Sequence, residues 1–170
     1  MKILILSDSH GSTEGLKVIK EQHQKECDAM IHCGDSELQK SDPLMQGFLA
    51  VRGNCDSDAN YQDLLVEEIG KFRFLITHGH HYNVKMTLLS LSYKSSEEAA
   101  DIVCFGHSHI AGSEMIGKTL FINPGSITLP KARLEKTYAI LETEEQEVKV
   151  TFFNSKGSVI KDLSKTYHLG

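Results

Sequence analysis

Side chains of the kind that bind metal ions recur along the sequence, each time directly after a short apolar run. The first example is the loop Ser7-Asp8-Ser9-His10-Gly11, which follows the run 2–6. A carboxylate and an imidazole two residues apart on a glycine-flanked loop offer an oxygen and a nitrogen ligand from a rigid base. Later blocks have the same build: Gly34-Asp35, Gly53-Asn54, His78-Gly79-His80 and Gly106-His107-Ser108-His109.

Together these blocks provide seven oxygen or nitrogen ligands: Asp8, His10, Asp35, Asn54, His78, His107 and His109. Such a set exceeds the need of one ion and suits two cations that share a carboxylate. In two-metal hydrolytic sites the ions lie about 3.5–4 Å apart, acidify a bridging water and bind the oxygens of a phosphoryl group. Each block alone has an ordinary structural explanation, such as an Asx turn at Gly34-Asp35. Their recurrence in order favours a metal centre.

The ordered blocks resemble the calcineurin-like metallophosphoesterase superfamily and, more narrowly, its small bacterial and archaeal phosphodiesterases. The similarity runs from Asp8 to His109 and extends to the turn Asn123-Pro124-Gly125-Ser126. It implies a four-layer αββα sandwich, an α/β (α+β) fold in which two mixed β-sheets are flanked by helices. It also implies a dimetal-dependent phosphodiesterase that hydrolyses small phosphodiesters by attack of a metal-activated hydroxide.

The resemblance further implies a role for each ligand. One ion is held by Asp8, His10 and His109, the other by Asn54, His78 and His107, and Asp35 bridges them. The cofactors would be two divalent metal ions. Manganese is the first candidate, and iron, zinc and nickel fit the same ligands, because imidazole and carboxylate ligands alone do not choose among these metals.

One position departs from the pattern of the larger members of the superfamily. Those members have Gly-Asn-His-Asp or Gly-Asn-His-Glu, in which the His donates a proton to the leaving group, whereas this chain has Cys55. The identity of the general acid is therefore open. We expect the catalytic residues among Asn54, His80 and Asp56, and substrate contacts from Arg52 and Asn54.

Two of these residues allow alternative interpretations. His80 either replaces His78 as a ligand or orients a ligand from outside the first shell, and a solvent-facing position is a third alternative. Arg52 could contact a substrate phosphate as a fork-shaped donor, or it could be solvated or ion-paired.

The superfamily also contains a small trafficking-complex subunit that uses this fold as a protein-interaction scaffold. A non-catalytic scaffold is therefore the alternative function. That branch has lost some of the metal-binding side chains, whereas all seven are present here. We expect an enzyme, a metal-dependent phosphoesterase of the hydrolase class.

Composition limits the partners. The formal net charge is −5, and the 18 Lys and Arg residues are scattered, which disfavours nucleic-acid and membrane binding. The sequence has neither a signal-peptide pattern nor the roughly 18–20 apolar residues of a membrane span, so we expect a cytoplasmic protein. The four cysteines lack a C-x-x-C pair and should be free thiols. The physiological substrate and the oligomeric state, a homo-oligomer included, are left open.

Apolar runs and turn residues predict the elements that position the blocks in a single domain, residues 1–170. We expect strands at 2–6, 28–33, 48–51, 101–105 and 119–122, a hairpin at 64–69 and 72–77, and helices from Ser12 or Thr13 to about Gln24 and over 84–93. The runs 138–142 and 148–153, joined by acidic residues, predict an exposed antiparallel hairpin that acts as scaffold. Substrate specificity should lie in the loops 36–46 and 79–85.

Overall fold

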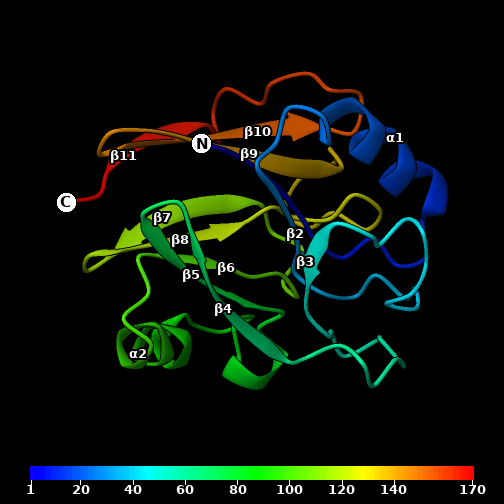
Figure 1. Cartoon of the computed structure of the whole chain (residues 1–170), viewed down its shortest axis with the longest axis horizontal. Helices are drawn as coiled ribbons and strands as arrows, with labels where there is room; N and C mark the ends of the chain where they lie inside the picture. Colours follow the sequence, from blue (N-terminus) through cyan, green and yellow to red (C-terminus); the bar gives the residue numbers. More distant parts are fainter.

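The computed structural model describes residues 1–170 and contains two β-sheets stacked face to face (Figure 1). The six-stranded sheet has the order β11 (Lys165–His168), β10 (Glu147–Asn154), β9 (Thr137–Glu144), β1 (Lys2–Leu6), β2 (Ala29–His32) and β3 (Phe48–Ala50). The five-stranded sheet has the order β4 (Leu64–Ile69), β5 (Phe72–Thr77), β6 (Ile102–Cys104), β8 (Thr119–Asn123) and β7 (Gly112–Ile116).

Both sheets are mixed. In the larger sheet β1, β2 and β3 run parallel, and β9 joins β1 antiparallel. In the smaller sheet β5, β6 and β8 run parallel, and β4 and β7 are antiparallel at its edges. Parallel strands covered on both faces need apolar side chains at every position, which explains the unbroken run Ile3-Leu4-Ile5-Leu6.

Successive side chains of β1 show how the layers form. Ile3 and Ile5 point into the core between the two sheets, whereas Leu4 and Leu6 pack with the buried side of helix α1 (Thr13–His23). On the outer face of the smaller sheet, a third apolar cluster includes Leu91 of α2 (Leu89–Glu97). Figure 1 shows the two helices on opposite outer sides of the sheets. The expected four-layer sandwich of two mixed sheets flanked by helices is confirmed.

The first helix and the β4–β5 hairpin lie where the sequence predicts them. The helix predicted over 84–93 is displaced, because the chain first forms a short 3₁₀ turn, η1 (His80–Tyr82), and then a left-handed residue, Asn83, with φ 53°. The apolar spacing of Val84 and Leu88 comes from a turn that packs against the outer face of the sheet. Neither α-helix has the length and apolar character that crossing a bilayer requires.

The prediction of an exposed C-terminal hairpin is half right. β9 and β10 do pair antiparallel, but β9 lies between β1 and β10, and its residues Tyr138 and Leu141 are fully buried. On β10, Val148, Val150 and Phe152 point into the core between the sheets. Exposure is limited to the acidic turn and to strand residues close to it, such as Glu142 and Lys149. The composition of the turn suggested more exposure than the strands have. The sequence also failed to indicate β7 and β11, which are short edge strands.

Because β10 contributes to the core, Phe152→Ala should lower the free energy of unfolding by about 3–5 kcal/mol, the usual cost of removing a buried aromatic side chain. Lys149→Ala on the same strand is the matched control, since its side chain is exposed, and it should change stability by less than about 0.5 kcal/mol. Urea unfolding measures both values. Equal, small losses would mean that the hairpin is peripheral.

Candidate metal centre

The loops that follow β1, β2, β5 and β6 meet at one edge of the sandwich. Backbone hydrogen bonds join them directly: Asp8 N–H donates to the Gly34 carbonyl at 3.0 Å, and His10 N–H donates to the Asp35 carbonyl at 2.9 Å. Gly106 N–H donates to the His78 carbonyl at 3.1 Å. The backbone therefore joins the blocks in two pairs, and the Asp8 carboxylate connects the pairs by accepting the His107 backbone N–H.

Left-handed backbone is concentrated in these loops. Of the ten non-glycine residues with positive φ, six belong to the centre: Asp8, His10, Asp35, Glu37, His107 and His109. A side chain in this region costs about 1–2 kcal/mol per residue. Such strain persists only where the surrounding structure fixes the conformation, and it is enriched at functional sites. The backbone thus marks the same loops as the ligand blocks.

Donor atoms of five predicted ligands converge. The Oδ1 atom of Asp8 lies 3.0 Å from His109 Nε2, 3.8 Å from His10 Nε2 and 3.9 Å from His78 Nε2. The Oδ2 atom of Asp35 lies 3.2 Å from His78 Nε2 and 3.9 Å from His10 Nε2. The triads Asp8–His10–His109 and Asp8–Asp35–His78 each hold their ligand atoms within 4.8 Å of one another.

The remaining two predicted ligands lie beside His78. Asn54 Oδ1 is 3.0 Å from His78 Nε2, and the His107 ring is 5.0 Å from the His78 ring between centroids. Burial, with the nearby His78 and Lys85, lowers the pKa of His107 to about 4. The His107 imidazole is therefore neutral at neutral pH, as a metal ligand must be.

The two carboxylates are buried and charged. Burial raises the pKa of Asp8, but the His109 and His78 rings and the Ser7 hydroxyl outweigh it and hold this pKa below its usual value. Burial also opposes ionisation of Asp35, and His78 together with the Cys55 backbone N–H again lowers the pKa. Asp8 Oδ2 accepts hydrogen bonds from the Ser7 hydroxyl and the His107 backbone N–H, whereas Oδ1, although 3.0 Å from His109 Nε2, has no donor aligned with it. A buried carboxylate oxygen without a donor fits a bound cation.

Hydrogen bonds to atoms outside the centre orient three of the imidazole rings. In each ring, Nδ1 donates to an oxygen at 2.7 Å: His10 to the Glu37 carboxylate, His78 to the Cys33 carbonyl, and His109 to the Leu129 carbonyl. A ring that donates from Nδ1 keeps the lone pair of Nε2 free toward the centre. The sequence analysis missed these acceptors, because Glu37 is 27 residues from His10 and two of the acceptors are main-chain carbonyls.

Asp56, which we predicted to be catalytic, has both oxygens occupied. Oδ2 accepts the backbone N–H groups of Asp35 at 2.8 Å and Gly53 at 2.7 Å. Oδ1 accepts the Glu37 N–H at 2.7 Å and the Ser36 hydroxyl at 3.3 Å. A catalytic role for Asp56 stays a prediction, and these bonds favour a carboxylate that fixes the loops of Asp35 and Asn54.

Cys55 and His80 lie close to the ligands. The Cys55 Sγ forms a third triad with donor atoms of His10 and Asp35, within 4.8 Å. Burial and Asp35 raise the pKa of Cys55 to about 11, so the side chain is a thiol at neutral pH. The His80 ring lies 5.4 Å from the His78 ring, and its buried Nδ1 has no hydrogen-bond partner. Burial lowers the pKa of His80.

Arg52 has a partner other than substrate. Its Nε and Nη2 atoms each lie 2.9 Å from Asp63 Oδ1. The ion-paired alternative therefore describes its position, and a substrate contact stays a prediction.

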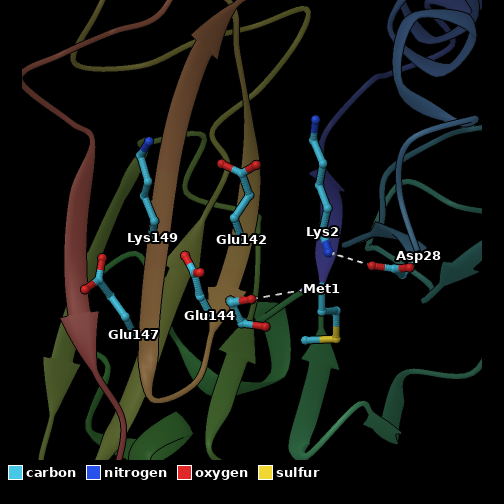
Figure 2. A pocket seen from close by; sticks show the side chains of 8 residues that line it. Met1, Lys2, Asp28, Glu142, Glu144, Glu147 and Lys149 are labelled. Carbon is cyan, nitrogen blue, oxygen red and sulfur yellow. Dashed lines mark hydrogen bonds between the residues drawn. The ribbon is translucent and has the colours of Figure 1, made fainter.

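A surface hollow of about 540 Å³ lies at the N-terminal end of β1, opposite to the end that carries Asp8 and His10 (Figure 2). Charged side chains surround it, among them Glu142, Glu144 and Lys149. Two main-chain donors there are already satisfied, since the Met1 amine donates to the Thr143 carbonyl and Lys2 N–H donates to Asp28. None of the predicted ligands lines this hollow.

The fold and the grouped carboxylates and imidazoles define a metallophosphoesterase type of site. Residues 1–146 match the model of the calcineurin-like phosphoesterase superfamily domain, and the chain belongs to this family. It is 47% identical to a probable metallophosphoesterase of Bacillus subtilis over 96% of both chains. It is 31% identical to a phosphodiesterase of Methanocaldococcus jannaschii, over 86% of this chain and 96% of the relative.

A solved structure agrees. The crystal structure of a predicted phosphoesterase from Streptococcus pneumoniae superposes with a TM-score of 0.94 at 36% identity, covering 98% of this chain and 97% of the other. The resemblance identified from the sequence is confirmed, and so is the enzyme class, a metal-dependent phosphoesterase.

His32 connects two of the ligand loops by hydrogen bonds. Gly34 N–H donates to His32 Nδ1 at 3.2 Å, so Nε2 bears the proton and donates to the Ser9 hydroxyl at 2.9 Å. Burial lowers the pKa of His32 to about 4, from 6.5. The unfolded chain therefore binds a proton between these pH values while the folded chain does not. Stability from this group is complete above about pH 6.5 and is lost as the pH falls toward 4.

His32→Gln keeps an acceptor and a donor but does not titrate. With metal removed by a chelator, the wild type should lose about 1.4 kcal/mol per pH unit more than the variant below pH 6.5, or about 2 kcal/mol at pH 5. Urea unfolding at pH 7.5 and pH 5 measures the difference. Identical pH dependence in both proteins would show that His32 is not held neutral.

Proposed function

We propose that this protein is a dimetal phosphodiesterase that hydrolyses small phosphodiesters. The observation that supports it most is the convergence of the Asp8, Asp35 and His78 ligand atoms within 4.8 Å, with Asp8 Oδ1 lacking a donor. We assign one ion to Asp8, His10 and His109, the other to Asn54, His78 and His107, and the bridging position to Asp35. The position of Asp35 Oδ2 between the His10 and His78 rings supports the last assignment.

Divalent ions bound there would supply Lewis acidity and lower the pKa of a water that attacks phosphorus. The chain itself supplies position. Glu37 and two main-chain carbonyls set which nitrogen of each ring faces the centre. Asp56 fixes the backbone that presents Asp35, and the rigid loops lower the cost of ordering the site during turnover.

Manganese is the metal we propose, with iron, zinc and nickel as substitutes. For the proton that the leaving group takes up, the centre offers the Cys55 thiol and the neutral His80 ring. A thiol whose pKa is about 11 is a weak acid, so diesters with good leaving groups, which need little protonation, are the favoured substrates.

The dimetal assignment predicts about two manganese ions per chain and activity that a chelator abolishes. Asp35→Asn should weaken both sites, since it removes the shared charge. Glu144→Gln, an exposed carboxylate in the hollow at the far end of β1, is the matched control. Elemental analysis and hydrolysis of bis(4-nitrophenyl) phosphate measure both effects, and full occupancy and turnover in Asp35→Asn would disprove the bridge.

Manganese should also raise the stability of the wild type, by about 2.7 kcal/mol at a hundredfold excess over Kd. The rise should be smaller in Asp35→Asn and unchanged in Glu144→Gln. Absence of any shift in the wild type would favour the protein-interaction scaffold instead.

Replacing the weak acid tests the substrate preference. Cys55→His places an imidazole at the exposed position next to Asn54, and it should raise phosphomonoester activity relative to diester activity because the ring can protonate a poorer leaving group. The measurement is the ratio of kcat/KM for one alkyl monoester and one aryl diester, at equal metal content. An unchanged ratio would point to another proton donor, and His80→Gln is then the next variant.

A further inference from the structure

A groove with partly apolar walls lies beside the loop that carries His107 and His109. Its inner part is a cavity of about 230 Å³ beside Ser108, the residue between His107 and His109. The walls of this cavity include Val84, Leu88, Phe105 and Phe121. A ligand pocket usually measures about 300–1,000 Å³, so this cavity suits one group of a ligand and not a whole one.

The groove continues away from the centre. A second hollow of about 480 Å³ shares Val84, Leu88 and Glu114 with the first and extends between Leu89 and Ile116. The groove thus runs between the segment 84–92 and the edge strand β7. Beside it, apolar side chains are exposed to solvent, with Met86 79% and Leu89 55% accessible. Neighbouring exposed apolar side chains at a groove are typical of a binding site.

The charges along the groove have an order. Lys85 lines only the inner cavity, which Ser108 also lines. Glu114 lines both hollows. A ligand in the groove would therefore meet a positive charge at the end next to the metal centre and a negative charge along its length.

We propose that this groove binds a neutral apolar ester group of the phosphodiester substrate, such as an aryl group, with Lys85 beside the anionic phosphoryl group. The proposal rests on the proposed function. The position of Ser108 between the predicted ligands His107 and His109 supports it, as do the apolar walls and the position of Lys85. Glu114 would repel a second anionic group on the substrate, which restricts the class to diesters whose ester substituent carries no negative charge.

Binding measured before turnover tests the groove directly. Dimethyl phosphate, methyl phenyl phosphate and methyl 3-carboxyphenyl phosphate are titrated at low temperature into ¹⁵N-labelled protein loaded with zinc, a diamagnetic ion that fits the same ligands. Methyl phenyl phosphate should shift amide signals of 84–92 and 112–116 and bind about tenfold more tightly than the other two. Shifts elsewhere only, or equal affinities for all three, would overturn the proposal.

Charge reversal provides the sharper test. Glu114→Lys should raise the affinity for the carboxylated ligand by about tenfold and should raise the affinity for methyl phenyl phosphate by less, because the carboxylated ligand has a second negative charge in the groove. Glu97→Lys is the matched control, because Glu97 is exposed on α2 but does not line the groove. If both substitutions changed the affinities equally, the change in net charge would explain the result, and the role of Glu114 would be overturned.

The remaining outcomes separate the two proposals. If the metal-loaded enzyme hydrolyses bis(4-nitrophenyl) phosphate but methyl phenyl phosphate inhibits it no better than dimethyl phosphate, the groove proposal fails and the proposed function stands. If no phosphodiester is hydrolysed while the amide shifts appear, the proposed function fails, and with it the substrate assignment. Concentration-dependent shifts of the groove without ligand would mean that a second copy of the chain occupies it.

Discussion

Two ionised carboxylates held out of water are the constraint on which the centre depends. Asp8 is fully buried and Asp35 is 2% exposed, and a buried charge is tolerated only when it is paired and hydrogen-bonded. Nearby imidazoles and backbone N–H groups meet this need in part. The unsatisfied Oδ1 of Asp8 remains, and it faces the nitrogen atoms of three histidines. A cation at this point would satisfy the carboxylate and the rings together, which is why the arrangement favours metal binding over a simple ion-pair network.

Holding such a cluster requires a backbone that cannot relax. The left-handed residues are restrained by bonds between loops, and Asp56 connects three backbone N–H groups with one carboxylate. Close approach matters as well. A Cβ atom at Gly53 would collide with the carboxylate and backbone of Asp35, and one at Gly106 would collide with the Ser7 hydroxyl. Both glycines are needed because the loops pass closer than any side chain allows. The parallel strands beneath, covered on both faces, give these loops a rigid base.

The ligand blocks could be predicted because each follows a strand, and strand ends on the same edge of a sheet meet in space. The hydrogen bonds between residues of different loops could not be predicted from the sequence. Glu37 reaches His10 from another block, and Asp56 has the same residue type as a catalytic acid although its oxygens bond the backbone. The displaced second helix has a related cause, since Val84 and Leu88 satisfy a helical period while packing from a turn. Likewise the acidic segment 143–147 led to the prediction of an exposed hairpin although β9 is largely buried, because its composition reflects the exposure of the turn and not that of the neighbouring strand.

The electrostatics of the centre and the shape of its surroundings favour the same kind of substrate. Burial lowers the pKa of His80 and of His107, so neither ring is an imidazolium at neutral pH, and the Cys55 thiol holds its proton too firmly to be an effective acid. A site without a strong proton donor acts best on esters whose leaving group is stable as an anion. Aryl oxygens meet this condition, and aryl groups are also what the apolar walls of Phe105 and Phe121 would accommodate. The weak acid near the ligands and the apolar walls of the groove therefore favour the same substrates, diesters with an aryl ester group.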